Sequence, residues 1–323
     1  MNRSAQHSGR YALPILLAVL AGTSCVTNRP HLDPVPPSDS TVRVELEPGG
    51  SVIVLDLEEY VVGSILAEAD IRGLNPETAE TVAQIQAILA RTYALANQGR
   101  HTDEGFDLCS TTHCQVYRPV STLSNQGAIL AQSAARATTG LVVSHDGLPI
   151  NALFHADCGG GTSDAGVAWG GPTPPYLHAV SDPFCLREEQ AGWQFTVTAA
   201  RLLAALNADP RTRVGADLYA VEPTEEDEAG RVATIVIRGD DSVSTVRGEE
   251  LRHILTRRFG PRSIKSTRFT VARRDNQFVF QGRGWGHGVG LCQLGSAARA
   301  GAGHTPAEIF HHYYPGTALT RYY

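Results

Sequence analysis

One glutamate stands at the end of an apolar run, where a carboxyl group can serve as a general acid. Residues 57–70 read LEEYVVGSILAEAD, and Glu68 closes the apolar part of this segment. Apolar neighbours disfavour the charged form of a carboxyl group, so its pKa rises toward the pH at which it can donate a proton. The alternative is an ordinary carboxylate at a helix end or on the surface, and most isolated glutamates are of that kind.

A second segment places two thiol and two imidazole side chains close together in the chain. They are His101, Cys109, His113 and Cys114. Sulfur and imidazole in a set of four are the ligands of tetrahedral zinc, which would be structural if the site is closed. If His101 swings away, the open position would suit a catalytic zinc. The alternative is a Cys109–Cys114 disulfide, but a bare disulfide gives no reason for the histidines.

A third segment, residues 282–295, reads GRGWGHGVGLCQLG. It lacks the lysine and the strand-to-helix pattern of a phosphate loop. So many glycines indicate tight turns and backbone that lies close to a ligand or to another chain segment. Trp285 offers a flat apolar face to a sugar ring, and both a packed structural corner and a binding cleft remain open. A nucleophilic pair of His287 and Cys292 would lack an orienting third residue.

The N-terminal residues have the features of a targeting segment. Arg3 and Arg10 precede an apolar run, residues 12–21, that is too short to span a bilayer as a mature helix. Residues 1–25 are therefore predicted to be a signal peptide, with Cys25 as the lipidated residue of a lipoprotein. Gly22 departs from the large aliphatic residue preferred at that position, so plain secretion is the alternative. Residues 26–41, rich in proline, are predicted to be a linker.

Two further cysteines are expected to pair if the chain is exported. Cys158 opens a glycine run and Cys185 follows a Ser-Asp-Pro-Phe segment. Disulfides form in oxidising compartments, so a Cys158–Cys185 bond is predicted. Cys292 would then be the odd thiol, buried in the fold.

The elements that must position these residues can be predicted from periodicity, caps and turns. Helices are expected over 76–97, 127–138, 199–207, 248–258 and from Pro306 onward, where Thr305 and Glu308 form a capping box. Strands are expected over 42–46, 51–57, 141–145, 150–155, 232–238, 268–272 and 278–281, and the acidic run 222–228 is expected to be a solvated loop. The predicted fold is α+β, with mixed β-sheets and short helices packed around a substrate cleft in one domain over residues 42–323.

Composition excludes several classes of function. The chain has 323 residues, 42% hydrophobic and 19% charged, with a net charge of −6, which is typical of a soluble globular protein. Its 27 basic residues are scattered and outnumbered by 33 acidic ones, so nucleic acid is not an expected partner. Lys265, the single lysine, has no phosphate-binding context, which argues against Schiff-base and pyridoxal phosphate chemistry.

Together these segments resemble the SpoIID/LytB family over about residues 42–323. The matching motifs are Glu59-Tyr60-Val61 with Glu68, Ala90-Arg91-Thr92-Tyr93-Ala94, Cys114-Gln115-Val116-Tyr117, Gly159-Gly160 with Thr162, Lys265-Ser266-Thr267, residues 284–293, and residues 312–317. The sequence departs from the family pattern after Glu68. Asp70 and residues 71–76 stand where the family has a proline and a short Trp-Pro link. This insertion either reshapes the cleft or removes catalysis. Cys292 stands where serine is common.

The resemblance implies a lytic transglycosylase that cuts peptidoglycan glycan strands during sporulation-like or general wall remodelling. Glu68 would protonate the oxygen between MurNAc and GlcNAc and then accept the proton of the MurNAc 6-hydroxyl, which gives a 1,6-anhydro product without water. Binding roles would fall to Arg91, Tyr93, Gln115, Tyr117, Trp285, His287 and Gln293. The His101, Cys109, His113 and Cys114 set resembles a metal site of some members.

Two other functions remain open. A non-catalytic protein could bind the wall and activate an N-acetylmuramoyl-L-alanine amidase, as the family's enhancers are thought to do. A zinc-dependent hydrolase would lose activity on chelation rather than on loss of Glu68, but no HExxH element supports it. In each case the expected location is the cell envelope, with a membrane contact only through an N-terminal lipid anchor.

Overall fold

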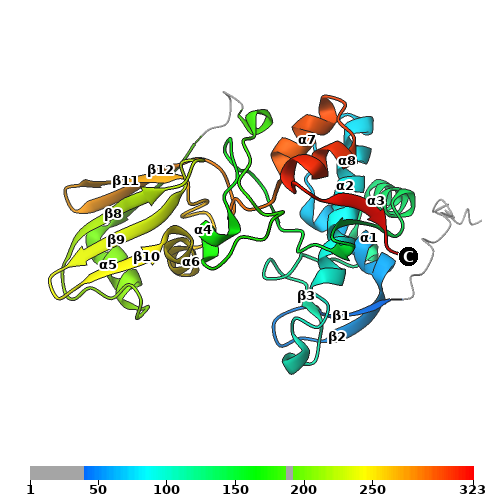
Figure 1. The fold of residues 1–323 in the computed structure, drawn as a ribbon. Helices are drawn as coiled ribbons and strands as arrows, with labels where there is room; N and C mark the ends of the chain where they lie inside the picture. The colour runs from blue at the N-terminus through cyan, green and yellow to red at the C-terminus, as the bar shows by residue number, and fades with distance from the viewer. Residues whose placement is uncertain (1–39, 187–191) are drawn as a thin grey trace, which may run out of the picture. The chain divides into compact units, whose positions relative to one another are not determined.

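The computed structural model describes residues 40–186 and 192–323 (Figure 1). The predicted signal peptide, the lipidation site Cys25 and nearly all of the predicted linker lie outside the described residues. The described helices are α1 (Leu57–Glu68), α2 (Pro76–Ala96), α3 (Asn125–Ala137), α4 (Ala165–Trp169), α5 (Ala199–Asn207), α6 (Gly248–Phe259), α7 (Gln293–Gly301) and α8 (Pro306–Tyr313). The described strands are β1 (Thr41–Glu45), β2 (Val52–Asp56), β3 (Leu108–Cys109), β4 (Leu141–His145), β5 (Leu148–Pro149), β6 (Phe154–His155), β7 (Trp193–Thr198), β8 (Leu218–Glu226), β9 (Val232–Gly239), β10 (Val243–Arg247), β11 (Phe269–Arg274), β12 (Gln277–Gly282), β13 (Leu291–Cys292) and β14 (Ala318–Arg321).

The first helix follows directly from an N-terminal hairpin. β1 pairs antiparallel with β2, and β3 adds to β1 in parallel. Asp56 ends β2 and caps α1 by accepting the Glu58 N–H at 2.8 Å. Because α1 is apolar on nearly every side, it is buried until its last turn, which ends at Glu68.

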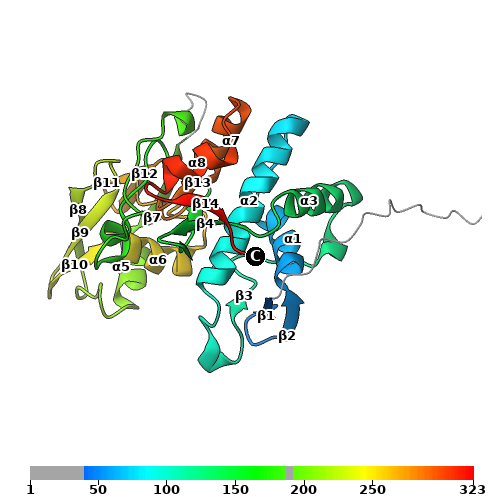
Figure 2. The same cartoon turned by 45° about the vertical axis from the view of Figure 1, so that its right-hand side comes forward.

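Helix α2 is the central element of this part of the fold, as Figure 2 shows. It starts where the sequence predicts, with Asn75 accepting the Thr78 N–H at 2.8 Å and Pro76 at the first helical position. Its buried side chains pack against α1, α3, α7 and β4. The insertion before it also packs, since Ile71 and Leu74 contact the core that contains the buried face of α2.

The C-terminal segments complete the same core. β14 pairs antiparallel with β4, and β13 pairs in parallel with β6. Thr305 and Glu308 form the predicted capping box at the start of α8. Ile309 and Phe310 of α8 are buried in the core that α2 shares, so the end of the chain helps to hold α2 in place.

A second group of strands has a core of its own. β8, β9 and β10 form one antiparallel sheet, and β11, β12 and β7 form another. Their inward side chains, with those of α5 and α6, make a separate cluster that includes Phe278 and Phe280. All described residues belong to one contact unit, Leu32–Tyr323.

The α+β fold class is confirmed, with two differences in detail. The acidic run 222–228 is not the predicted loop: β8 extends through Glu226, because its backbone pairs with β9 while its carboxylates remain at the surface. The predicted strand 150–155 is reduced to β6, since Ile150 and Ala152 are buried in irregular backbone after the short β5. The turn between β4 and β5 has Asp146 and Gly147 at positive φ.

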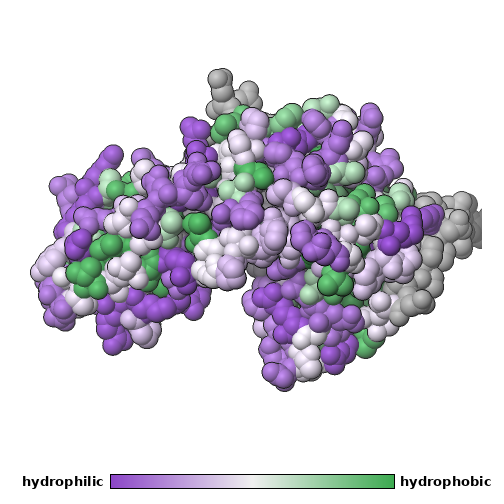
Figure 3. Space-filling view, in the orientation of Figure 1, coloured by the Kyte–Doolittle hydropathy of each residue, from purple (hydrophilic) through white to green (hydrophobic). Residues whose placement is uncertain are grey.

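Hydrophilic residues cover most of the face in Figure 3, with small apolar groups between them. This is the surface expected when the apolar side chains fill the cores. Within residues 40–186 and 192–323, no helix is both long and apolar enough to cross a bilayer.

Candidate functional site

Glu68 lies at the C-terminal end of α1, half-buried, as its position in the sequence predicts. One carboxylate oxygen, Oε1, accepts a hydrogen bond of 2.5 Å from the backbone N–H of Val116. Burial raises the pKa of Glu68 above its ordinary value, and this hydrogen bond opposes part of the rise. A carboxyl group in these surroundings is suited to donate a proton.

The segment that carries Val116 lies against α1 because Gly63 has no side chain. A Cβ at Gly63 would lie 2.3 Å from Tyr117 Cε2 and 2.6 Å from the Arg118 carbonyl oxygen. The Arg118 N–H donates to the Gly63 carbonyl at 3.1 Å. This close approach explains why residue 63 is a glycine, and it brings the Cys114-Gln115-Val116-Tyr117 motif to Glu68.

Two tyrosines and a glutamine fill the space beside this contact. Tyr117 stacks on Tyr60 with ring centroids 5.7 Å apart. The Tyr60 hydroxyl donates to Gln115 Oε1 at 3.1 Å. Gln115 Nε2 is buried, and among the described residues it has no hydrogen-bond partner. The structure therefore brings the predicted Gln115 and Tyr117 against α1, on either side of the Val116 that contacts Glu68.

Gln293, the first residue of α7, reaches the same place from the far end of the chain. Its Nε2 donates to the Glu68 carbonyl oxygen at 3.1 Å and lies 3.3 Å from Gln86 Oε1. Gln86 was not predicted as a site residue, and Tyr60 was expected only as part of the Glu59-Tyr60-Val61 motif. A polar side chain on the apolar face of α2 is the signal that could have identified Gln86.

Two other predicted binding residues lie elsewhere. Arg91 is fully buried and forms a bidentate ion pair with Glu58, with both N···O distances at 2.7 Å. Its Nη1 also donates to the Leu141 carbonyl at 3.0 Å. Tyr93 is buried in the core of the N-terminal hairpin, and burial raises its pKa to about 12. These contacts favour structural roles, and a substrate contact for either residue stays a prediction.

The glycine-rich segment carries two ring side chains, the exposed Trp285 and the less exposed His287. Trp285 is 43% exposed, with Lys265 Nζ 5.0 Å from its ring centroid. His287 Nε2 lies 2.9 Å from the Phe154 carbonyl, and its Nδ1 accepts the Val289 N–H at 3.1 Å. Burial lowers the pKa of His287 to about 4, so the ring is neutral near pH 7.

Trp169 of α4 is a further exposed aromatic residue near this segment. Its ring centroid lies 5.2 Å from that of His287, and it lines a pocket together with Arg247 and Glu249. Among the described residues, no hydrogen bond or ring contact joins Glu68 to Trp285, His287 or Trp169. The common cleft predicted for these motifs therefore stays a prediction.

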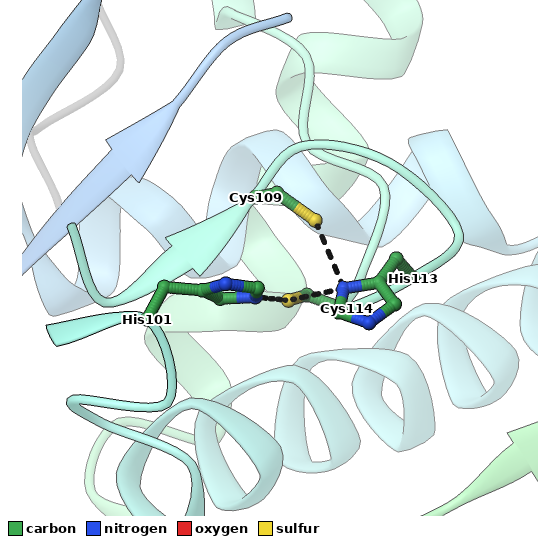
Figure 4. A group of neighbouring side chains, drawn as sticks. All are labelled: His101, Cys109, His113 and Cys114. Atoms are coloured by element: carbon green, nitrogen blue, oxygen red, sulfur yellow. Dashed lines mark hydrogen bonds between the residues drawn. The ribbon is translucent and has the colours of Figure 1, made fainter. Parts of the chain in front are cut away.

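The four predicted metal ligands come together in one cluster, which Figure 4 shows. One ligand atom from each of His101, Cys109, His113 and Cys114 lies within 4.8 Å of the others. Both cysteines are free thiols. His113 Nδ1 is 3.8 Å from each sulfur, and His101 Nε2 is 3.2 Å from Cys114 Sγ.

This donor set fits zinc. Two sulfurs and two imidazole nitrogens are a common tetrahedral set. His101 Nδ1 lies 2.5 Å from Glu104 Oε1, the kind of carboxylate contact that orients a metal-bound histidine. Cys114 immediately precedes the segment that contacts Glu68, so an ion in this cluster would anchor that segment.

The second predicted cysteine pair has a third sulfur beside it. Cys158, Cys185 and Cys292 are all buried and are all free thiols in the structure. Cys292 is buried as predicted, but Cys185 Sγ lies only 3.5 Å from Cys292 Sγ. The Cys158–Cys185 disulfide stays a prediction.

Comparison with known proteins shows which family the chain resembles. Residues 49–145 match the family model SpoIID, described as "Stage II sporulation protein", and residues 186–290 match a domain of unknown function, DUF8618. The chain is 28% identical to "Stage II sporulation protein D" of Bacillus subtilis over 284 residues, which are 84% of this chain and 76% of that protein.

Two other relatives are equally similar in sequence. An uncharacterized protein of Brachyspira hyodysenteriae is 28% identical over 83% of this chain and 67% of its own length. The "Amidase enhancer" of Bacillus subtilis is also 28% identical, over 73% of this chain but only 37% of its own length. The match over residues 49–145 and these relatives make the chain similar to the SpoIID/LytB family, in agreement with the motifs of the sequence.

Proposed function

We propose that the protein acts on the bacterial cell wall as a lytic transglycosylase, with Glu68 as its acid and base. The observation that carries this proposal is the half-buried carboxyl at the end of α1, with a raised pKa and one hydrogen bond from Val116. A carboxyl that stays protonated at higher pH can donate to the glycosidic oxygen. The same group, once ionised, accepts the proton of the 6-hydroxyl as that oxygen closes on C1.

A single carboxylate suffices for this reaction because the nucleophile belongs to the substrate. Ordinary glycosidases pair an acid with a second carboxylate that acts as nucleophile or activates water. Here the 6-hydroxyl replaces water. The amide of Gln293 contacts the Glu68 carbonyl oxygen, and we assign it a polar contact with the sugar. Gln115 is buried and directly precedes Val116, so we assign it to holding that segment beside Glu68. We assign the exposed Trp285 to stacking on a sugar ring.

A zinc ion in the His101, Cys109, His113 and Cys114 cluster would be structural. The cluster lies at the start of the segment that carries Gln115 and Val116. Zinc would supply a fixed anchor there, and the chemistry would remain with Glu68. We also propose that the protein is exported to the cell envelope, with Cys25 as the lipid anchor.

The alternative function is activation of a cell-wall amidase without cleavage of glycan. The similarity to a protein named amidase enhancer favours it, and so does the insertion after Glu68. Both functions require glycan binding. Only the enzyme requires an ionisable group at position 68.

Product analysis separates the two functions. The purified full chain and its Glu68→Gln variant are incubated with intact peptidoglycan and with glycan strands stripped of peptide, and the products are identified by mass. We expect anhydro-MurNAc ends from the wild type alone. Products from both proteins would show that a residue other than Glu68 is the catalytic acid. Glycan binding without products from either protein, together with a faster reaction of an added amidase, would support the activator.

A further inference from the structure

A second set of four metal-ligand side chains lies outside the site described above. Cys158, Asp182, Cys185 and Cys292 are each 0% exposed, and one ligand atom of each lies within 4.8 Å of the others. They come from three separate stretches of the chain: a glycine turn, the residues before and within a short 3-10 turn, and the residue before α7. This set of three cysteines and one aspartate, enclosed in the interior, has the composition of a metal-binding site.

The distances suit tetrahedral coordination. Cys185 Sγ and Cys292 Sγ are 3.5 Å apart, and Cys158 Sγ is 3.4 Å from Asp182 Oδ2. Zinc binds thiolate sulfur at about 2.3 Å and carboxylate oxygen at about 2.1 Å, which places tetrahedral ligands about 3.5–3.8 Å from one another. The four atoms need to move little to enclose an ion of that size.

Backbone N–H groups point at the sulfurs. Cys292 Sγ accepts from the N–H groups of Cys158 and Gly295, at 3.2 and 3.3 Å. Cys158 Sγ accepts from the Gly160 N–H at 3.4 Å. Hydrogen bonds of this kind favour a thiolate over a thiol, and the position of Cys292 as the N-cap of α7 adds to the effect. Thiolate is the form that binds a metal.

Two buried arginines supply positive charge around the cluster. Arg299 Nη2 is 3.3 Å from Asp182 Oδ1. Arg231 is 1% exposed and donates to the Cys158 carbonyl and to Thr267. No described carboxylate pairs with the Arg231 guanidinium, and its Nε has no described partner. A buried guanidinium is stabilised by nearby anions. Thiolates of Cys158 and Cys292 would add to the more distant carboxylates of Asp227 and Glu249 that already act on Arg231.

The formal charges then cancel. Three thiolates and one carboxylate carry four negative charges, against two from a zinc ion and one from each of Arg231 and Arg299. Asp157 adjoins the cluster, with its Oδ1 3.1 Å from Cys185 Sγ.

The aspartate is also held as metal ligands usually are. The Tyr313 hydroxyl donates to Asp182 Oδ2 at 2.6 Å, which orients the carboxylate together with Arg299. Gly295 leaves room for both groups, because a Cβ there would lie 2.0 Å from Asp182 Oδ2 and 2.3 Å from the Tyr313 oxygen. Residue 295 is therefore a glycine because any side chain there would displace Asp182 and Tyr313.

We propose that Cys158, Asp182, Cys185 and Cys292 form a structural zinc site, distinct from the His101 cluster. On binding, the three thiols release their protons and four protein bonds to the ion form. The site ties the 158–185 region to the start of α7. Since Gln293 directly follows Cys292 and contacts Glu68, the ion would fix one wall of the site around Glu68. A Cys158–Cys185 disulfide would leave Cys292 and Asp182 without the other two ligands.

Metal content tests the proposal directly. The full chain is prepared with Cys109→Ser and Cys114→Ser, which disable the other cluster, and zinc is measured by mass spectrometry after purification without chelator. We expect one zinc per chain, lost when Cys292→Ser is added. Replacement by cobalt(II) should give thiolate charge-transfer absorption that Cys292→Ser removes. A folded Cys109→Ser/Cys114→Ser protein that contains no zinc and takes up no cobalt would overturn the proposal.

A second variant and a thiol measurement guard against a folding artefact. Asp182→Asn keeps the size of the side chain, and we expect it to release zinc to a competing chelator at least tenfold more readily. Alkylation in denaturant with chelator, without reductant, should label Cys158, Cys185 and Cys292 individually. A linked peptide pair containing Cys158 and Cys185, lighter by two hydrogens, would show the disulfide and overturn the metal site.

Discussion

Val116 donates its backbone N–H to the carboxylate of Glu68, although the two residues are 48 positions apart in the chain. The contact forms because Gly63 admits the 115–118 segment onto α1 and because Cys114 anchors the start of that segment in the His/Cys cluster. The segment that ends in Glu68 and the Cys114-Gln115-Val116-Tyr117 motif are therefore in direct contact. The environment of the proposed acid depends on both.

The pH dependence of cleavage should follow this hydrogen bond. The protonated carboxyl is the acid, so the rate falls as the pH rises through the pKa of Glu68, which burial places above its ordinary value. Val116→Pro removes the N–H that stabilises the carboxylate. The pKa should rise further, and the alkaline limb of kcat/KM should move to higher pH. Val116→Ala keeps the N–H and should leave the limb in place; equal shifts in both variants would contradict this role.

Loss of zinc from the His101 cluster should lower activity through the segment that carries Val116. With Cys114→Ser we expect a loss of at least about 10–100-fold in cleavage, since even residues that only orient the ligands of a metal site commonly have effects of that size. Hydrogen exchange at Val116 should speed up in parallel. Thr112→Ala, at an exposed position of the same turn, is the control. A loss of activity with unchanged protection at Val116 would instead favour a catalytic zinc.

Local sequence signals predicted the helices that have strong caps. They did not predict contacts between residues far apart in the chain. Asn75 with Pro76 and Thr305 with Glu308 fix the starts of α2 and α8 through groups within a few residues. In contrast, nothing local to Gly63 indicates that Tyr117 will occupy the space of its missing side chain.

The same limit applies to the predicted site residues. The sequence placed Glu68, Gln115 and Gln293 in matching motifs, but the partners that surround them come from distant segments. Arg91 has the charge of a ligand-binding residue. Only the fold shows that Glu58, the second residue of α1, neutralises that charge in the interior.

Gly63→Ala should destabilise the fold and impair the site together. The added methyl group would overlap Tyr117 and the Arg118 carbonyl, so the 115–118 segment must shift. We expect a loss of about 1–3 kcal/mol in the free energy of unfolding, measured in urea, and a matching fall in cleavage. Gly301→Ala is the control: in α7 its Cβ would meet only Thr78, at 3.8 Å. That variant should be neutral or more stable by up to about 1 kcal/mol. A Gly63→Ala protein as stable and active as Gly301→Ala would disprove the close packing.

Arg91→Met should cost far more stability than its place in a binding motif suggests. It leaves the Glu58 carboxylate buried and unpaired, which costs about 3–5 kcal/mol. Removing both charges, in Arg91→Met with Glu58→Met, should recover much of that loss because no unpaired charge remains.

The matched control is Arg72→Met, whose pair with Asp70 is exposed on both sides. It should leave the free energy of unfolding almost unchanged, because solvent and salt screen an exposed pair. Urea unfolding of the four proteins, with glycan binding measured per folded molecule, decides between the two roles of Arg91. Normal stability with weakened glycan binding in Arg91→Met would restore the substrate-binding role. A large loss of stability with unchanged binding makes the Arg91–Glu58 pair the internal support of α1, and thereby of the helix that ends in Glu68.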